Sequence, residues 1–222
     1  MNFKPTLTKL NRLYTSIAGS IIIVFISGCS VFGINSVEEA GYQVLKKDHS
    51  FELRRYQALL VVETQVDADF EEAGGLAFDR LFGYISGNNQ QKSKIAMTAP
   101  VIANQNDSSQ GEKINMTAPV FEERNDGGWR YMFVLPASYS IETAPIPLDP
   151  EVKLSVIPEK KVAVNRYTGF WNEKVMNEKM QQLDDWIAAN DLVTASKPRW
   201  AGYNPPWTIP FLRRNEVMID VM

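Results

Sequence analysis

The sequence contains one nine-residue phrase twice, as KIAMTAPVI at residues 94–102 and as KINMTAPVF at residues 113–121, and seven of the nine positions are identical. Repetition of a fixed phrase across a short polar spacer is typical of a fold with internal symmetry. We therefore expect the two copies to occupy equivalent positions in a duplicated structure. Proline cannot donate to a β-ladder, so Pro100 and Pro119 are expected at strand edges or bulges.

Hydrophobic periodicity indicates two strand-strand-helix units. Residues 50–56 and 58–66 read as strands, and the following helix has a capping residue at Asp69, apolar residues with a 3.6-residue period up to Ile85, and an end at Gly87-Asn88. A similar pattern recurs about 102 residues later, with a strand at 160–168 and a helix ending at Asn190. Residues 129–135 and 216–221 also read as strands. The pattern predicts a duplicated α+β fold.

The N-terminus predicts export. Three basic residues precede an almost unbroken apolar run at 17–26, which ends in Ser27-Gly28-Cys29. This arrangement resembles the bacterial lipoprotein signal, in which the cysteine is acylated. In that family a serine directly after the cysteine, as at Ser30, implies an outer-membrane location facing the periplasm. The alternative is a single membrane-spanning anchor, but the apolar run is shorter than the ~20 residues that a bilayer core requires. We expect a signal at 1–28, a lipidated N-terminus and tether at 29–39, and one folded domain at 40–222.

Composition argues against several classes of function. Without residues 1–28 the chain has 20 basic and 26 acidic residues, a formal charge of −6, and this balance is unsuited to nucleic acid. The chain has one histidine, His49, and one cysteine, Cys29. The common arrangements for nucleophilic catalysis therefore cannot be assembled, and we expect no enzymatic activity.

Four motifs in order carry a family resemblance. ELRRY at 52–56, both copies of the repeated phrase, AGYNP at 201–205 and RNEV at 214–217 resemble the SOUL haem-binding family, and the match runs from about Tyr42 to Val221. The resemblance implies a distorted antiparallel β-barrel or curved sheet with two flanking helices in two pseudo-symmetric halves, and kinship with ligand-binding domains of multidrug-sensing regulators. It also implies haem or tetrapyrrole binding in an apolar groove beside one helix.

In some members of that family a histidine at the position of Arg55 ligates the iron. Arginine does not, so the resemblance implies haem binding without a histidine axial ligand. Other candidate metal ligands are His49, Met97 and Met116. Each has a more ordinary interpretation, because an isolated loop histidine seldom finds a metal and methionine commonly fills gaps in a core.

Candidate ligand-binding residues lie on the first helix and on the strand before it. Apolar contacts are expected from Phe70, Leu76, Ala77 and Phe78, with close approach of a planar ring over Gly74-Gly75. Haem propionates are expected to pair with Arg54, Arg55 and Arg80. Tight packing of helix on sheet would equally explain the glycines, and a solvated face would explain the arginines.

Two other functions remain open. The chain could be a binding module for other small apolar ligands, as its kinship with drug sensors and its Arg55 suggest. It could also be a non-catalytic structural or interaction protein of the cell envelope.

Overall fold

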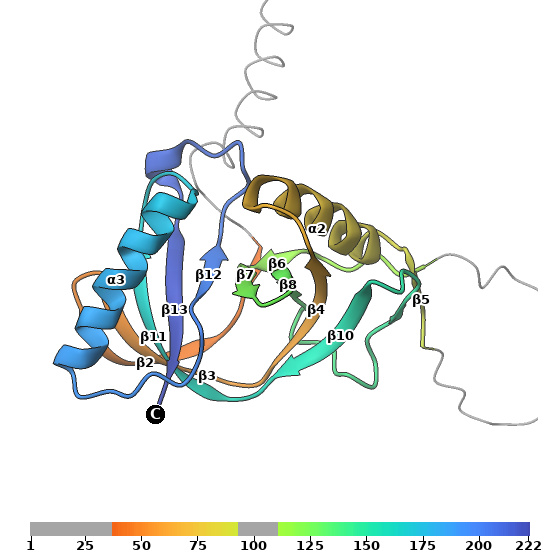
Figure 1. The fold of residues 1–222 in the computed structure, drawn as a ribbon. Coiled ribbons are helices and arrows are strands. Elements are labelled where there is room, and N and C mark those ends of the chain that lie inside the picture. Colours follow the sequence, from red (N-terminus) through yellow and green to blue (C-terminus); the bar gives the residue numbers. More distant parts are fainter. Residues whose placement is uncertain (1–36, 93–110) are drawn as a thin grey trace, which may run out of the picture.

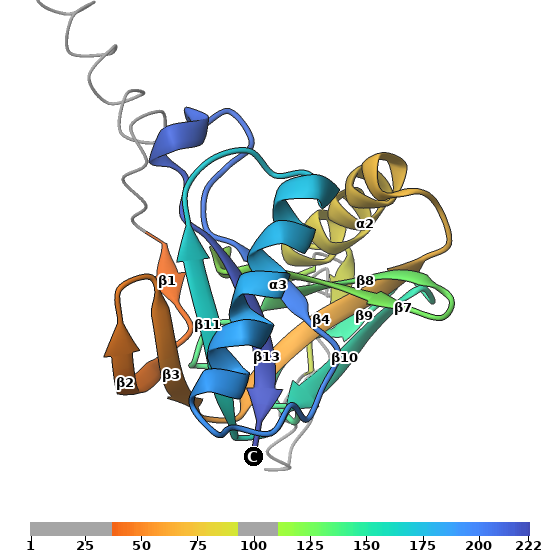
Figure 2. The same ribbon diagram turned by 60° about the vertical axis from the view of Figure 1, so that its left-hand side comes forward.

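The computed structural model describes residues 37–92 and 111–222. Nine strands form one antiparallel sheet in the order β10-β4-β8-β7-β12-β13-β11-β3-β2. Figures 1 and 2 show that the sheet is curled and that both helices lie on the same face of it. The sheet strands are β2 (Tyr42–Asp48), β3 (Phe51–Tyr56), β4 (Leu59–Val66), β7 (Val120–Asn125), β8 (Gly128–Val134), β10 (Val152–Ile157), β11 (Lys160–Tyr167), β12 (Arg199–Gly202) and β13 (Asn215–Val221).

The remaining elements are short pieces and the two helices. Helix α2 (Phe70–Ile85) lies over β4 and β8, and α3 (Glu173–Ala189) lies over β11 and β13. Two-residue strands pair as β1 (Glu38–Glu39) with β6 (Thr117–Ala118) and as β5 (Asn89–Gln90) with β9 (Ile146–Pro147), and a 3₁₀ helix η1 spans Pro210–Leu212. Among the described residues no helix is long and apolar enough to cross a bilayer.

The strand order confirms the predicted duplication. Reading inward from the two ends, and leaving out the edge strand β2, β10 corresponds to β3, β4 to β11, β8 to β13 and β7 to β12. The pseudo-two-fold axis thus passes between β7 and β12. Leu59–Val66 and Lys160–Tyr167 match at a shift of 101 positions, one fewer than expected from the sequence. The first strand of each half pairs with the second strand of the other half.

The second copy of the repeated phrase runs through β6 into β7. The expectation that the two copies occupy symmetry-equivalent positions stays a prediction. Pro119 separates β6 from β7, as expected for proline at a strand edge. Pro100 and the rest of the first copy lie outside the described residues.

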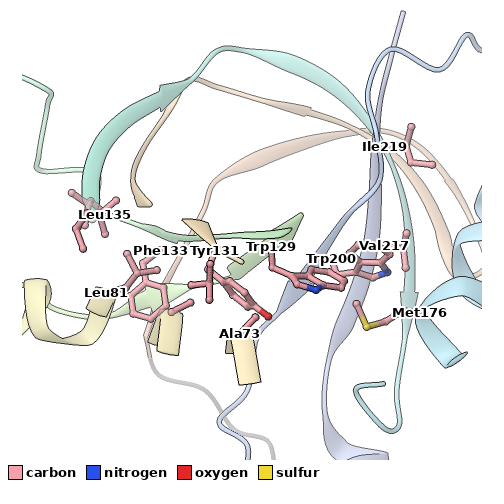
Figure 3. Close-up of a cluster of buried hydrophobic side chains, with 14 of the residues drawn as sticks. Ala73, Leu81, Trp129, Tyr131, Phe133, Leu135, Met176, Trp200, Val217 and Ile219 are labelled. Carbon is pink, nitrogen blue, oxygen red and sulfur yellow. The ribbon is translucent and has the colours of Figure 1, made fainter. Parts of the chain in front are cut away.

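Alternation along the strands builds a core on each face of the sheet. On β8, Trp129, Tyr131 and Phe133 face the helices, whereas Met132 and Val134 face the opposite side. Figure 3 shows the helix-side cluster, in which Ala73 and Leu81 of α2 pack on the same face of the sheet as Tyr131 and Phe133 of β8. The sheet therefore has two different faces, one covered by the two helices and one without helices.

Capping explains where both helices begin. The Asp69 side chain accepts a hydrogen bond from the Glu72 N–H at 3.0 Å, and the Asn172 side chain accepts one from the Val175 N–H at 3.0 Å. The expected cap of the first helix is thus confirmed, as is the end of the second at Asn190. One boundary differs from expectation: Glu38 and Glu39, assigned to the tether, form β1 and pair with β6.

Candidate ligand-binding site

An apolar row along α2 is the part of the predicted site that the structure assembles. Gly74, Phe78 and Phe82 are spaced four residues apart, so they lie along one side of the helix. Phe78 and Phe82 are 40% and 48% exposed, and their rings stack at 5.6 Å between centroids and 10° between planes. The Phe78 ring also meets Phe133 of β8 edge-on at 5.6 Å. We call Gly74, Phe78 and Phe82 the α2 row.

The α2 row presents aromatic surface beside a backbone that a flat molecule can approach. A Cβ added at Gly74 would lie 3.5 Å from the Tyr131 hydroxyl, which is ordinary contact, and a Cβ at Gly75 would meet nothing within 4 Å. Gly74 therefore fits the packing interpretation, while Gly75 leaves the helix surface open. Phe82 was not among the predicted residues, although its spacing of four from Phe78 could have identified it.

Three predicted apolar residues do not join the row. Ala77 lies on the inner side of α2 and is fully buried, so it is not part of the exposed surface of the α2 row. Phe70 packs edge-on against Trp129 with centroids 5.1 Å apart, at the first turn of the helix. Leu76 is exposed, but it is two residues from Phe78 and residues at that spacing point to different sides of a helix.

The three predicted arginines lie in three separate places. Arg80 donates from Nη1 to Thr64 Oγ1 and to the Gln65 carbonyl, both at 3.3 Å, and these contacts put it on the β4 side of α2. Arg55 is on β3, with its Nε 4.0 Å from Glu159 Oε1 and with nearly half of its side chain exposed. Arg54 is fully buried. The structure therefore does not bring the three arginines together, and Arg80 alone belongs to α2.

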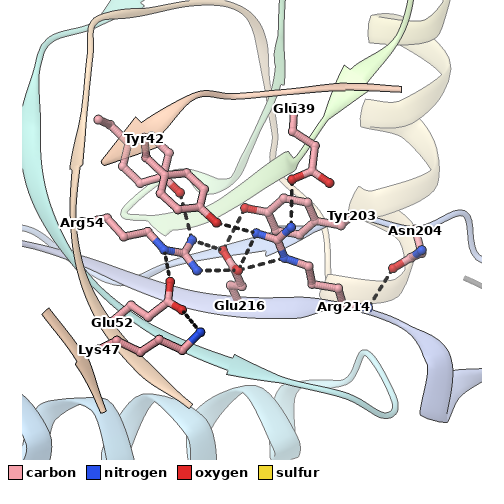
Figure 4. Close-up of polar contacts among 10 residues, drawn as sticks. Glu39, Tyr42, Lys47, Glu52, Arg54, Tyr203, Asn204, Arg214 and Glu216 are labelled. Carbon is pink, nitrogen blue, oxygen red and sulfur yellow. Dashed lines mark hydrogen bonds and ion pairs between the residues drawn. The ribbon is translucent and has the colours of Figure 1, made fainter. Parts of the chain in front are cut away.

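Arg54 belongs to a buried network on the face away from the helices, shown in Figure 4. Its Nη1 and Nη2 donate to the two carboxylate oxygens of Glu216 at 2.8 and 2.9 Å, and its Nε donates to Glu52 at 2.7 Å. The Tyr203 hydroxyl donates to Glu216 at 2.8 Å, and Arg214 approaches the same carboxylate at 2.9 Å. Burial alone would raise the pKa of Glu216, but the hydrogen bond and charge of Arg54 hold that pKa below its ordinary value.

This network explains the motifs in structural terms. Glu52 and Arg54 come from ELRRY, Tyr203 from AGYNP, and Arg214 and Glu216 from RNEV. Bidentate pairing of guanidinium and carboxylate ties strand β3 of the first half to β13 of the second. Three of the motifs therefore form a polar core that joins the two halves, and they do not contribute ligand contacts beside α2.

The candidate metal ligands are spread widely. His49 lies in the exposed turn between β2 and β3, where its Nδ1 is 2.7 Å from Asp48 Oδ1, and Asp48 also accepts from Trp186 of α3. His49 thus lies beside α3 and not beside α2. Met116 lies near the end of α2 in the chain path, two residues after Ile114. The Ile114 N–H donates to the carbonyl of Ile85, the last residue of α2, at 2.8 Å. Cys29 and Met97 lie outside the described residues. Within residues 37–92 and 111–222 no group of three or more His, Cys, Asp and Glu side chains could hold a metal ion.

Comparison with known proteins identifies the family. The sequence model of the SOUL heme-binding protein family matches residues 37–110 and 102–220. The chain belongs to this family. It is 27% identical over 185 residues to heme-binding protein 2 of Homo sapiens, covering 82% of this chain and 81% of that protein. It is 24% identical over 173 residues to heme-binding protein 1 of Xenopus laevis, covering 76% and 82%.

Solved structures support the fold of this SOUL protein. The C-terminal domain of EcmrR superposes with a TM-score of 0.52 at 13% identity, over 82% of this chain and 98% of that one. A structure described as a hydrolase from Listeria innocua gives a TM-score of 0.52 at 12% identity, over 80% and 94%. At this identity the likeness concerns the fold alone. It confirms the expected α+β architecture of a curled antiparallel sheet with two helices.

Proposed function

We propose that this protein is a non-enzymatic binder of haem or a related tetrapyrrole, held without a covalent bond and without a histidine axial ligand. The observation that carries the proposal is the stacked, exposed pair Phe78–Phe82 on α2, in a chain whose relatives are named heme-binding proteins. A planar macrocycle laid against these rings would remove apolar surface from water. Iron, when bound, would supply the redox and ligand chemistry.

Affinity in such a site would come mainly from apolar contact. Full burial of one phenylalanine side chain is worth about 1.5–3 kcal/mol, so covering two half-exposed rings gives roughly that amount in total. Removing both rings should therefore weaken binding by roughly tenfold or more.

Titration with hemin tests this proposal. The full-length chain, in detergent, should give saturable Soret changes in the micromolar range, and Phe78→Ala/Phe82→Ala should weaken them. Leu76→Ala is the matched control, since it removes an exposed apolar side chain from another side of the same helix. His49→Ala and Arg55→His should both leave the spectrum unchanged, because the structure places neither residue on α2. Saturation by the double variant equal to that of the wild type would contradict the proposal.

A second candidate function is binding of other small apolar molecules at the same α2 row. The observation that favours it is the position of His49, the one histidine of the sequence. It lies in the β2–β3 turn beside α3, whereas the proposed site lies on α2. Thermal-shift measurements distinguish the two functions. Stabilisation by a lipid or a hydrophobic drug, with porphyrins inactive, would favour the second. If no small molecule stabilised the protein, a structural or interaction role in the envelope would be preferred.

We also propose that the protein is anchored in the cell envelope through an acylated Cys29, in the outer membrane facing the periplasm. The signal-like residues 1–28 support this location. A second support is a cluster of exposed aromatic side chains, Phe170, Trp207 and Phe211, at 65%, 66% and 68% exposure. The Gly169 N–H donates to the Pro210 carbonyl at 3.0 Å, which holds the two loops together beside the start of α3 (Figure 1).

Metabolic labelling tests the anchor. Cells fed an alkyne-bearing palmitate analogue should incorporate it into the wild-type chain, and Cys29→Ala should abolish incorporation. Labelling that persists in Cys29→Ala would overturn this assignment.

A further inference from the structure

The exposed aromatic cluster of Phe170, Trp207 and Phe211 lies at the end of the molecule where both helices begin. Phe170 is three residues before Glu173, the first residue of α3. Figures 1 and 2 show that η1, which contains Phe211, lies at the same end as the first turns of α2 and α3. A surface that touches the cluster therefore also approaches the start of both helices.

A series of side-chain contacts leads from the start of α3 to the start of α2. Arg124 of β7 places its Nη1 3.5 Å from Glu173 Oε1. The same guanidinium lies 5.5 Å from the centroid of the Trp129 ring, and Trp129 packs edge-on against Phe70 with centroids 5.1 Å apart. Phe70 is the first residue of α2 and lies four residues before Gly74 of the α2 row. The α2 row thus begins at the end of the molecule that carries the aromatic cluster.

From Phe70 the α2 row leads away from this end of the molecule. With a rise of 1.5 Å per residue, Phe78 lies about 12 Å and Phe82 about 18 Å farther along the helix axis. The helix surface is open before the stacked rings, because a Cβ added at Gly75 would meet nothing within 4 Å. Exposed aromatic rings therefore lie at both ends of a short path, the cluster at one end and the Phe78–Phe82 pair at the other.

The proposed tether would keep the same end of the molecule close to the bilayer. Residues 30–37 alone separate Cys29 from β1, and an extended chain of that length reaches at most about 30 Å. The strand β1 is itself fixed to the domain, since Glu39 Oε2 lies 2.8 Å from Arg214 Nη1. Arg214 follows Phe211 by three residues. The docked end of the tether therefore lies near the aromatic cluster.

We propose that the α2 row exchanges its ligand directly with the lipid bilayer, and that the aromatic cluster is the contact that makes this exchange possible. The inference rests on the proposed haem site and on the proposed anchor. A flat apolar molecule that travelled through water would first expose its whole apolar surface, and this exposure slows transfer. Aromatic side chains are favoured at the boundary between lipid and water, so the cluster would hold the start of α2 against the bilayer and remove the aqueous gap.

The rate at which the protein takes up hemin from vesicles tests the proposal. Hemin is dissolved in phosphatidylcholine vesicles that carry the full-length chain, and the Soret band reports its arrival on the protein. Phe170→Ser/Trp207→Ser/Phe211→Ser should slow this uptake by roughly tenfold or more, since burial of even one large apolar side chain changes an equilibrium by about that factor. Val193→Ser is the matched control, because Val193 is 56% exposed and lies beyond the other end of α3. This variant should take up hemin like the wild type.

An aqueous scavenger tests the route with the wild type alone. Excess apomyoglobin outside the vesicles captures any hemin that passes through water. The initial rate of uptake by the wild-type chain should stay unchanged, because the ligand does not leave the apolar phase. Uptake that apomyoglobin abolishes would overturn the proposal, whether or not the triple variant folds.

Titration in detergent separates this proposal from the proposed haem function. The triple variant should bind hemin there with the affinity of the wild type, because none of its three positions belongs to the α2 row. Equal rates of uptake from vesicles by the wild type and the triple variant, with hemin bound by both in detergent, would overturn direct exchange and leave the haem site intact. Loss of affinity in detergent as well would also overturn it, since the cluster would then act in binding. Failure of the wild type to bind hemin in detergent would instead refute the haem function, and direct exchange with it.

Discussion

At the scale of single residues, Glu122 ties stability to pH. Its pKa in the folded protein is raised to about 8 from an ordinary 4.5. Between these values the unfolded chain loses the proton that the folded chain keeps, so rising pH favours unfolding. The free energy of unfolding of the wild type should therefore fall relative to that of Glu122→Gln, by on the order of 2 kcal/mol between about pH 5 and pH 8. Urea denaturation of both proteins at both pH values measures this. An equal change in the free energy of unfolding for the wild type and for Glu122→Gln would contradict the prediction.

Arg54 and Arg55 are adjacent in sequence and should respond very differently to substitution. Arg54→Met would leave the carboxylates of Glu52 and Glu216 buried without their main partner, and removal of one member of a buried pair costs about 3–5 kcal/mol. Arg55→Met, at an exposed site, should change stability by less than about 0.5 kcal/mol. Chemical denaturation compares the two variants. Similar losses would mean that the network contributes little.

The same network gives a pH dependence of opposite sign. The pKa of Glu216 is lowered in the folded state, because Arg54 outweighs the effect of burial. The stability that this carboxylate contributes is thus present above its unfolded pKa of about 4.5 and is lost as the pH falls through the lower folded value. In Arg54→Met this acid-dependent loss should be much smaller, which unfolding curves below about pH 4.5 would reveal.

The sequence could not distinguish these two arginines. Alternation predicted that neighbours on β3 face opposite sides, but both sides carried an arginine, and only the pairing of β3 with β11 and the fold of β13 decide which one is buried. Glu122 was missed for a related reason. Glu122 stands in a run of polar residues in the sequence, and Tyr131 and Trp200 become its neighbours only through the pairing of β7 with β8 and β12.

At the scale of elements, the two N-caps offer a matched pair of tests. Asp69→Ala and Asn172→Ala each remove one side-chain hydrogen bond to the first turn of a helix. Each should lower the free energy of unfolding by about 1 kcal/mol. Lys153→Ala, at an exposed position of β10, is the control. Denaturation midpoints test this, and a cap variant with an unchanged midpoint would show that tertiary packing alone fixes that helix end.

Helices and inner strands were predictable because burial imposes a period on them. The apolar stripe of α2, with Ala73, Ala77 and Leu81 fully buried, follows the helical repeat. The edge strand β2 escaped prediction because nearly all of it is exposed, so selection for alternation is absent. Membership of the α2 row also depends on the sheet below: Phe78 meets Phe133, whereas Arg80 meets β4. The helix sequence alone does not say which side faces a ligand.

At the scale of the whole molecule, each half places its first strand beside the second strand of the other half. Because β3 pairs with β11 and β10 pairs with β4, each half completes the sheet of the other. The Arg54–Glu216 pair adds a buried link between them. Neither half can therefore be expected to fold alone, and the two halves meet at the centre of the sheet where β7 pairs with β12.

The proposed Cys29 anchor and the exposed aromatic cluster together predict an orientation of the molecule at a membrane. Trp207, at 66% exposure, is the most exposed tryptophan, and Arg214 of the same region pairs at 2.8 Å with Glu39, the last residue of the expected tether. A single acyl chain gives only marginal membrane binding, so a second contact at the membrane surface is expected to add to the anchor. In vesicles of brominated phosphatidylcholine the anchored chain should show quenched tryptophan emission, and Trp207→Phe should remove most of that quenching. Trp171→Phe should not, and equal quenching in both variants would contradict docking through this cluster.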